Sequence, residues 1–351
     1  MDTVVKKINR KQMNTEDFAE ASRILHRGGL VAFPTETVYG LGGNALDPEA
    51  AARIYAAKGR PSDNPLIVHI ADVRALDVLA VNIPQTAWRL AERFWPGPLT
   101  MILQKSPAVP LSTTGGLETV AIRMPSDEIA EELIRSSGLY IAAPSANASG
   151  RPSTTRAEHV YEDLAGRIEM ILDGGPVQIG LESTIIDLTT EHPLILRPGY
   201  ISLEDIRELI PEADYDPAVL KHKPQENIVA KAPGMKYRHY APKGCLTIYE
   251  GDAMAVVETI NRDLEQREGQ GHKCAVLATD ETKQYYRADI VKSIGSRKDE
   301  EGIAARLFDI LREFDEERVE YIYSESFEGG QLGQAIMNRL LKAAGYHVVE
   351  V

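Results

Sequence analysis

Short loops rich in hydroxyl, amide and cationic side chains follow several apolar, strand-like runs of this sequence. The first loop, residues 33–45 (FPTETVYGLGGNA), contains Thr35 and Thr37 together with an acid, a tyrosine and three glycines. A loop of this composition can present hydroxyl groups and backbone N–H groups to a ligand. A tight structural turn is the alternative interpretation, because proline and glycine end many strands without any further role.

Two cations two residues apart stand at the expected end of a helix, in the segment KGRPSDNPLIVHI. They are Lys58 and Arg60; Asn64 follows them, and His69 lies inside the next strand-like run. The cations suit an anionic ligand, although near a helix C-terminus they could simply offset the helix dipole. A lone histidine among apolar neighbours is more often a hydrogen-bonded core residue than a ligand.

A third loop, APSANASGRPS at residues 143–153, directly follows a strand-like run. It begins at Ala143 and carries Ser145, Asn147 and Ser153. In open α/β sheets ligands gather beyond the carboxyl ends of the strands, so these hydroxyl and amide donors could hold a phosphate. An ordinary serine-rich loop remains the alternative.

Four further residues complete the set of candidates. Thr119 and Arg123 lie four apart in one strand-like run, so their side chains point to the same face. Such a pair could hold a carboxylate or a phosphate, or could lie at an exposed sheet edge. Ser183 opens another run, and Arg197 precedes Pro-Gly.

Together these residues predict an enzyme or a binding protein for a small, multiply charged anion. The spacing shows no paired Cys and His ligands for a metal and no Ser-His-Asp arrangement. No GxGxxG or GxxxxGK[ST] pattern follows a strand-like run, which argues against a standard nucleotide-binding fingerprint. The residues alone leave the ligand unidentified.

Alternation of apolar runs with helical patterns predicts an α/β fold for both halves of the chain. The segment 211–243 contains five prolines and little periodicity, which predicts a linker. From residue 245 onward, five strand-like runs alternate with three helical segments and predict a doubly wound parallel sheet. In the first half, strands are expected to begin near residues 30, 66, 99, 119, 139, 169, 183 and 194, and helices to cover residues 14–27, 48–58, 85–94, 127–135, 155–164 and 202–209.

The charge balance bears on the class of partner. The formal net charge is −13, and only residues 211–244 carry a basic excess, with six basic against four acidic residues. This balance disfavours a protein devoted to nucleic-acid binding, which usually presents a basic face. No run approaches the roughly 18 apolar residues that span a bilayer, and the first residues do not resemble a signal peptide. We therefore expect a cytoplasmic protein.

At the level of ordered motifs, the sequence resembles the two-domain threonylcarbamoyl-AMP synthases, whose N-terminal domain is YrdC-like. The resemblance covers essentially the whole chain. It implies a YrdC-like, twisted mixed-sheet α/β domain over residues 1–210, an extended linker over 211–243 that contacts the active site, and a smaller Rossmann-like domain over 244–351. The matching strings are PTETVYGLG at 34–42, the KxR at 58–60 followed by NPL and His69, WPGPLT at 95–100, the SxN at 145–147, STI at 183–185, RPG at 197–199 and PGMKYRHYAP at 233–242.

The resemblance implies that L-threonine, bicarbonate and ATP yield threonylcarbamoyl-AMP and pyrophosphate, a nucleotidyl transfer. Magnesium is expected on the triphosphate, without dedicated protein ligands. The implied catalytic cations are Lys58, Arg60 and Arg197. The implied ATP-binding residues are Lys58, Arg60, Asn64, Thr119, Ser145, Asn147, Ser153, Arg197 and Tyr237. The implied threonine-binding residues are Thr35, Thr37, His69, Arg123, Ala143 and Ser183.

The resemblance also implies a place in tRNA modification, as the first step of threonylcarbamoyladenosine (t6A) formation next to the anticodon. The expected partners are the small substrates and the tRNA threonylcarbamoyltransferase complex that receives the product, with weak or indirect tRNA binding and no membrane. Two other functions stay open. One is carbamoyl transfer through a carbamoyl-adenylate, although the larger proteins of that kind carry acylphosphatase and zinc-finger segments that this sequence lacks. The other is an RNA-binding or ribosome-associated module.

Overall fold

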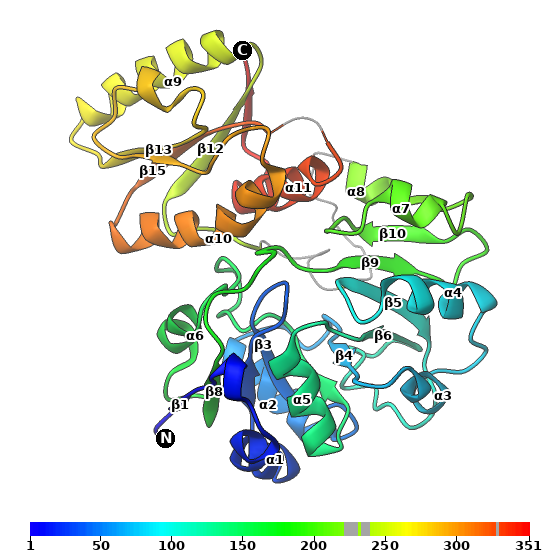
Figure 1. The fold of residues 1–351 in the computed structure, drawn as a ribbon. Coiled ribbons are helices and arrows are strands. Elements are labelled where there is room, and N and C mark those ends of the chain that lie inside the picture. Colours follow the sequence, from blue (N-terminus) through cyan, green and yellow to red (C-terminus); the bar gives the residue numbers. More distant parts are fainter. Residues whose placement is uncertain (221–230, 233–238, 328–329) are drawn as a thin grey trace. The chain divides into compact units, whose positions relative to one another are not determined.

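The computed structural model describes residues 1–220, 231–232, 239–327 and 330–351, and the chain forms two compact units (Figure 1). Each unit has its own sheet, mixed in the first and parallel in the second. The predicted α/β class of both halves is therefore confirmed. Among the described residues, the first unit comprises residues 1–149, 153–220 and 231–232, and the second comprises residues 150–152, 239–327 and 330–351.

Within its described residues, the first unit forms an 11-stranded sheet in the order β1-β8-β2-β3-β7-β4-β6-β5-β9-β10-β11. The strands are β1 (Val4–Lys7), β2 (Val31–Phe33), β3 (Gly40–Asn44), β4 (Ile67–His69), β5 (Leu99–Gln104), β6 (Thr119–Arg123), β7 (Ile141–Ala142), β8 (Met170–Asp173), β9 (Thr184–Asp187), β10 (Leu194–Arg197) and β11 (Asp214–Tyr215). The helices are α1 (Ala19–His26), α2 (Pro48–Lys58), α3 (Leu76–Leu79), α4 (Gln85–Phe94), α5 (Glu128–Ser137), α6 (Ala157–Leu164), α7 (Leu203–Arg207) and α8 (Pro217–Leu220).

Helix α2 has the bounds that its end signals predict. The Asp47 carboxylate accepts a hydrogen bond from Glu49 N at 3.0 Å, and Pro48 occupies the first turn. The helix ends at Gly59, whose φ of 62° lies in the left-handed region that glycine adopts without strain. This ending fixes Lys58 as the last helical residue.

Strand β3 falls where the sequence predicted only a loop. It pairs antiparallel with β2 and with β7. Its glycines are needed for close packing, because a Cβ on Gly42 would lie 2.7 Å from Ile141 Cγ2 and 2.8 Å from Phe33 Cε1. The prediction of a loop beyond Val38 was wrong, since glycine in a strand can mark a close approach and not a turn.

Two more differences concern the ends of the first sheet. Strand β1, which was not predicted, pairs parallel with β8 at one edge. At the other edge β11 pairs parallel with β10, and α8 follows it, both within residues expected to form the linker. These elements are two to four residues long, too short to show a periodicity in the sequence.

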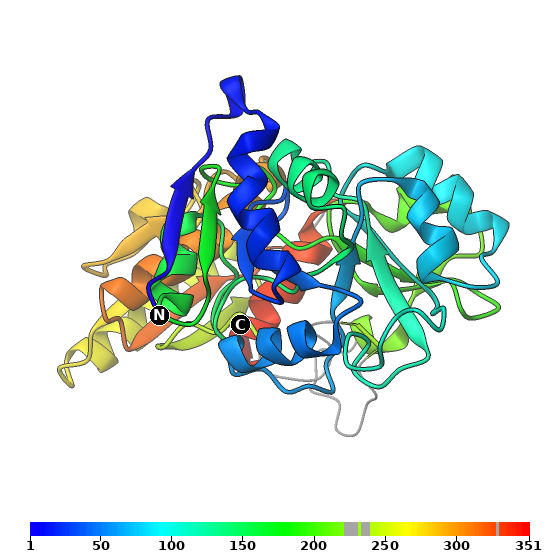
Figure 2. The same cartoon turned by 90° about the horizontal axis from the view of Figure 1, so that it is seen from below.

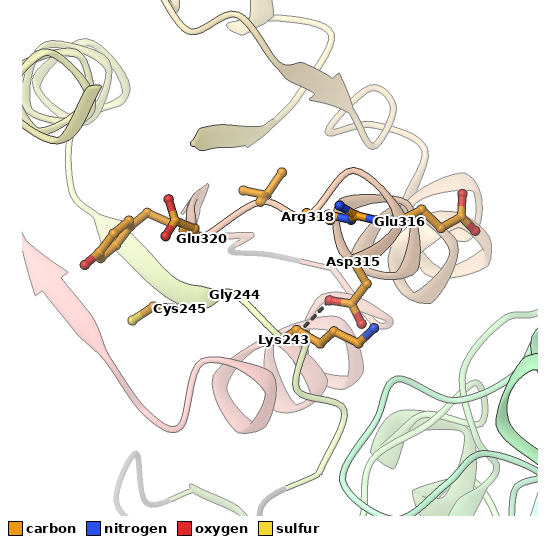
Figure 3. Close-up of a pocket in the computed structure, with 9 residues that line it drawn as sticks. Lys243, Gly244, Cys245, Asp315, Glu316, Arg318 and Glu320 are labelled. Atoms are coloured by element: carbon orange, nitrogen blue, oxygen red, sulfur yellow. Dashed lines mark hydrogen bonds between the residues drawn. The ribbon is translucent and has the colours of Figure 1, made fainter. Parts of the chain in front are cut away.

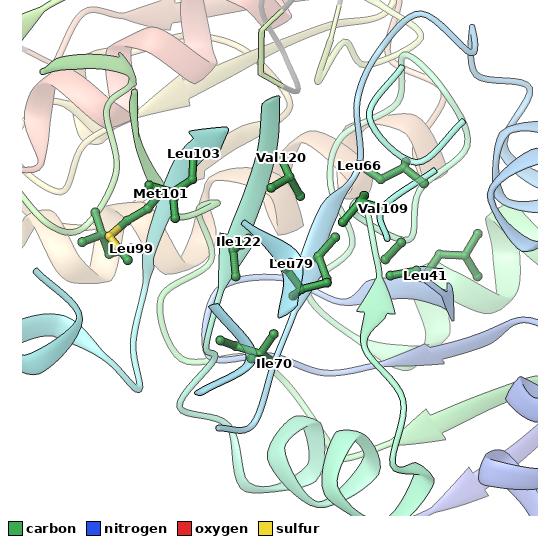
Figure 4. Close-up of a cluster of buried hydrophobic side chains, with 14 of the residues drawn as sticks. Leu41, Leu66, Ile70, Leu79, Leu99, Met101, Leu103, Val109, Val120 and Ile122 are labelled. Carbon is green, nitrogen blue, oxygen red and sulfur yellow. The ribbon is translucent and has the colours of Figure 1, made fainter. Parts of the chain in front are cut away.

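One face of the central strands packs against a large apolar core. Met101 and Leu103 on β5 and Val120 and Ile122 on β6 point into this core, as Figure 4 shows. Because side chains alternate along a strand, the residues between them must face the other way. The opposite face of the same strands is therefore free to carry polar groups.

A second apolar cluster lies under α1 and α5. Leu25 of α1 and Leu133 of α5 are both fully buried in it, together with Phe33 of β2. Figure 2 shows α1 (dark blue) beside α5 (green). This cluster supports β2 and the turn that follows it.

The second unit has a five-stranded parallel sheet in the order β14-β13-β15-β12-β16. Its strands are β12 (Cys245–Glu250), β13 (Cys274–Ala278), β14 (Val291–Ser293), β15 (Tyr321–Glu325) and β16 (Val348–Glu350), and its helices are α9 (Ala253–Glu268), α10 (Glu300–Glu316) and α11 (Gly333–Ala343). Figure 1 shows α9 on one face of this sheet and α10 and α11 on the other. This is the predicted doubly wound arrangement.

Candidate active site

The face of the first sheet opposite the apolar core carries a row of polar residues. In the register of the sheet, Arg123 on β6 pairs with His69 on β4 and with Thr100 on β5. All three side chains are buried. The alternation that places Val120 and Ile122 in the core thus places Arg123 in this row.

The turn after β2 meets this row at Arg123. Arg123 Nη1 donates to Thr37 Oγ1 at 2.9 Å, and the hydroxyls of Thr35 and Thr37 lie 2.9 Å apart. Arg123 Nη2 lies 2.7 Å from Glu36 Oε1, but outside hydrogen-bonding geometry. Thr37, a residue of the predicted threonine site, thus contacts another, Arg123, which lies 86 residues away in the sequence.

A second group forms around Ser183 at the start of β9. Thr100 Oγ1 and Ser183 Oγ lie 2.7 Å apart. Arg197 donates from Nε to Ser183 O at 3.0 Å and from Nη2 to Ser183 Oγ at 3.2 Å. Ser183 therefore links the row on the sheet to the predicted catalytic cation Arg197.

The loop after β7 surrounds Lys58. Lys58 Nζ donates to the carbonyl oxygens of Ser145 and Asn147, and Ser145 Oγ donates to Asn147 Oδ1 at 2.5 Å. Arg60 Nη2 donates to Asn64 O at 3.2 Å. The KxR and SxN motifs are therefore in direct contact through Lys58.

Backbone contacts join these groups into one site. Ala143 N donates to Ile67 O at 2.8 Å, and an isolated bridge pairs Gly40 with Ser145. Gly180 N donates to Thr37 O at 3.0 Å. The turn after β2 thus contacts both the loop after β7 and the segment before β9.

His69 is a neutral imidazole in this site. Burial, and after it the positive charge of Arg123, lowers the pKa of His69 to about 3. Its Nδ1 donates to Ile67 O at 3.1 Å. Near neutral pH the ring therefore offers hydrogen bonds and adds no charge to the site.

The three remaining predicted site residues are Thr119, Ser153 and Tyr237. Thr119 begins β6, about 13 Å along the strand from Arg123 at the usual rise per residue. Ser153 Oγ donates to the Glu182 carboxylate. Tyr237 lies outside the described residues.

Three polar residues of the site were not singled out from the sequence, namely Glu36, Thr100 and Glu182. Each one lies inside or beside one of the sequence motifs named above. Glu36 lies within PTETVYGLG, Thr100 ends WPGPLT, and Glu182 precedes the STI string. Their positions next to other candidates were the available signal.

Several buried polar atoms of the site have no hydrogen-bond partner among the described residues. They are both carboxylate oxygens of Glu36, Nε and Nη2 of Arg123, and the side-chain oxygen and nitrogen of Asn64. Such atoms cost about 1–3 kcal/mol each when they stay unpaired. Their concentration here fits a site whose partners arrive with a ligand.

No group of three or more His, Cys, Asp or Glu side chains in the described part of the chain is arranged to hold a metal ion. No helix there is both long and apolar enough to cross a membrane. Figure 3 shows a pocket of the second unit, where Lys243 N donates to Asp315 Oδ1 at 2.6 Å; its lining contains no predicted site residue.

Two family models match the chain in order. The model described as "Telomere recombination" matches residues 23–199. The model described as "Threonylcarbamoyl-AMP synthase, C-terminal domain" matches residues 201–345. Together they cover most of both units.

Individual relatives match over nearly their full lengths. A threonylcarbamoyl-AMP synthase of Pyrococcus abyssi is 51% identical over 94% of this chain and 95% of its own length. One of Bacillus subtilis is 50% identical over 96% of this chain and 95% of its own length. The crystal structure of P. abyssi Sua5 in complex with L-threonine matches with a TM-score of 0.93 and 48% identity, covering 99% of this chain and all of that one. This chain therefore belongs to the threonylcarbamoyl-AMP synthase family.

Proposed function

We propose that this chain condenses L-threonine, bicarbonate and ATP into threonylcarbamoyl-AMP and releases pyrophosphate. The observation that carries the proposal is the site itself, in which three buried cations lie beside hydroxyl-rich loops in a chain about 50% identical to named synthases. A relative of 48% identity was crystallised with L-threonine. These facts support threonine and a nucleotide as ligands.

The chemistry requires stabilisation of negative charge on phosphate oxygens. The amine of threonine combines with bicarbonate to form a carbamate, and a carbamate oxygen attacks the α-phosphorus of ATP as pyrophosphate leaves. Lys58, Arg60 and Arg197 are the candidates to stabilise this charge, because all three are buried and preorganised. No covalent nucleophile is needed, so positioning of the reactants supplies much of the rate.

The threonine end of the site is assigned to the group around Arg123. A guanidinium matches a carboxylate in two places, and Nε and Nη2 of Arg123 have no hydrogen-bond partner among the described residues. This supports Arg123 as the ligand of the substrate carboxylate. The neighbouring hydroxyl groups, the neutral imidazole and one backbone segment would contact the rest of threonine. These groups belong to Thr35, Thr37, His69, Ser183 and the backbone of Ala143.

The nucleotide end is assigned to the group around Lys58. Asn64, whose side-chain amide lacks a partner among the described residues, supports this assignment. Magnesium would be bound by the triphosphate oxygens, which are the hard ligands it prefers. The further nucleotide contacts are Thr119, Ser145, Asn147, Ser153 and Tyr237.

The linker is proposed to contact the site. Lys231 Nζ donates to Asp187 Oδ2 at 3.0 Å on β9. Ala232 is fully buried in a cluster that includes Ile67 and Ala121. These two strand residues share the face that carries His69 and Arg123, so Ala232 lies on the side of the sheet where the site is.

Downstream, the proposed product is an activated adenylate for tRNA modification. We infer that the tRNA threonylcarbamoyltransferase complex receives it for t6A formation next to the anticodon, in the cytoplasm, and that this chain binds tRNA weakly or indirectly. The net charge of −13 supports a small-molecule enzyme over an RNA-binding module.

The test is pyrophosphate release from ATP and bicarbonate, with and without L-threonine, in the absence of RNA. We expect threonine-dependent release and a product of the mass of threonylcarbamoyl-AMP. Release that does not depend on threonine would point to carbamoyl transfer. No release would point to an RNA-binding module.

A further inference from the structure

Glu36 is a buried carboxylate for which the reaction described above has no use. It separates Thr35 from Thr37 and is only 5% exposed. Neither of its carboxylate oxygens accepts a hydrogen bond from any described residue. Burying a carboxylate is costly, and the ion pair with Arg123 at 2.7 Å offsets this cost.

The turn that carries Glu36 does not depend on its carboxylate. Thr35 Oγ1 accepts hydrogen bonds from Thr37 N and Val38 N, each at 3.2 Å, and donates to Val38 O at 2.7 Å. Glu36 O accepts from Ile179 N at 2.9 Å. Other groups therefore hold the backbone, and the carboxylate is aimed at the site without a structural task in the turn.

Glu36 and Arg123 together complement a free amino acid. Such a molecule carries a carboxylate and an ammonium group on one carbon, and the two side chains present a cation and an anion 2.7 Å apart. We propose that Glu36 binds the α-ammonium group of the substrate amino acid and accepts its proton before the carbamate forms. This inference rests on the proposed function and on Arg123 as the carboxylate ligand.

The proton must leave because an ammonium nitrogen has no lone pair with which to attack. Transfer to Glu36 leaves a neutral amine and a protonated carboxyl group. The amine nitrogen then forms a C–N bond to the carbon of bicarbonate, and water leaves with one oxygen of bicarbonate. The products are the carbamate, one water and protonated Glu36, so atoms and charge balance.

The charged surroundings of Glu36 suit this task. Arg123 from β6 faces it directly, and His69 on β4 pairs with Arg123 in register and stays neutral. Glu182, in the segment that packs on this turn, accepts a hydrogen bond from Ser153. The competing interpretation is that Glu36 only neutralises Arg123.

The first experiment compares Glu36→Gln with the unchanged protein from about pH 6.5 to about pH 8.5. For the variant, kcat/KM for threonine should fall about 10²-fold or more at the acidic end. It should then rise about tenfold per pH unit with the fraction of free amine, whereas the unchanged protein should show a nearly flat profile. KM for ATP should stay the same, and Glu36→Asp should keep the flat profile.

Glu169→Gln is the matched control, since Glu169 also pairs with an arginine, Arg53, and accepts a backbone hydrogen bond, from Leu30 N. Its pH profile should remain flat. The inference would be overturned by a folded Glu36→Gln protein whose pH profile is flat, or whose kcat/KM falls equally for threonine and for ATP. If the unchanged protein released no threonine-dependent pyrophosphate, the proposed function itself would fail instead.

A measurement on the unchanged protein covers the case in which Glu36→Gln does not fold. The probe is 2,3-dihydroxybutanoate, in which a hydroxyl replaces the amine of threonine. Binding at least about tenfold weaker than that of threonine supports an anionic partner for the ammonium group. Binding as tight as that of threonine would overturn the inference.

Discussion

Two buried glutamates, one in each unit, have opposite surroundings. Glu325, at the end of β15, is 2% exposed and accepts hydrogen bonds from Tyr286 Oη at 2.8 Å, from Thr279 Oγ1 at 3.2 Å and from Thr282. Arg297 pairs with the same carboxylate. Both oxygens of the Glu325 carboxylate therefore have partners within the protein.

Glu36 in the first unit forms an ion pair with Arg123, and neither of its carboxylate oxygens accepts a hydrogen bond of good geometry from a described residue. A fully bonded polar network makes a core rigid, whereas a partly bonded one is costly unless something else completes it. The difference between the two carboxylates separates a structural network from a site prepared for a ligand. We therefore expect substitutions around Glu325 to affect stability, and substitutions around Glu36 to affect catalysis.

The largest expected effect comes from Lys58→Met in the first unit. Lys58 is 3% exposed and is held by two backbone carbonyls of the loop after β7. Removing a preorganised cation that stabilises developing charge should lower kcat about 10²–10³-fold. Steady-state pyrophosphate release at saturating substrates measures this.

The control for this change is Lys292→Met in the second unit. Lys292 pairs with Glu313 at 2.7 Å, outside the candidate site. Its kcat should match that of the unchanged protein. A kcat for Lys58→Met within about threefold of the control would show that Lys58 only supports its loop.

The next effect is on stability and belongs to the second unit. Glu325→Gln places an amide N–H₂ group among donors and removes the charge that Arg297 pairs with. We expect a loss of about 2–3 kcal/mol in the free energy of unfolding, with kcat and both KM values unchanged. Urea denaturation beside steady-state kinetics checks this, and a kinetic loss without a stability loss would reverse the contrast with Glu36.

The sequence predicted those elements whose signals are local. The observed bounds of α2 and α4 are those expected, because a capping aspartate, a proline and a glycine mark the ends of α2, and α4 follows directly after Pro84. β3 was not predicted because its glycines are required by close packing against residues distant in the sequence, such as Ile141, and not by residues adjacent to them. The sequence pattern around β3 does not show which distant residues will pack against it.

The candidate site was predictable as a list of residues but not as a set of contacts. Arg123 and Thr37 meet only through the sheet order β3-β7-β4-β6, which no single motif reveals. Glu36 was overlooked because an acid beside a predicted threonine ligand suggests nothing by its type alone. Its significance is that its carboxylate pairs with Arg123 and accepts no hydrogen bond of good geometry from a described residue, and that is a property of the folded chain.

A pH-dependent effect on stability should come from His69 in the first unit. Its pKa lies at about 3 in the folded protein against 6.5 as its ordinary value. Between these two values the unfolded chain binds more protons, so stability is complete above about pH 6.5 and falls as pH decreases toward 3. His69 should contribute up to about 1.4 kcal/mol per pH unit to the slope of the free energy of unfolding against pH. His69→Gln should remove this contribution, and urea denaturation at several pH values measures it. An unchanged slope would show that His69 is not buried as a neutral ring.

The smallest effect should come from Lys231→Met in the linker. Lys231 is 44% exposed, so its ion pair with the buried Asp187 should contribute at most about 1 kcal/mol to stability. If the linker contacts the site, removing the Lys231 ammonium group should mainly raise KM for ATP, by about two- to fivefold. Lys283→Met, which removes an exposed pair with Asp280 in the second unit, is the control and should leave KM unchanged. Equal KM values for the two variants would separate the linker from the site, and the contrast between the units would then rest on the sheet residues alone.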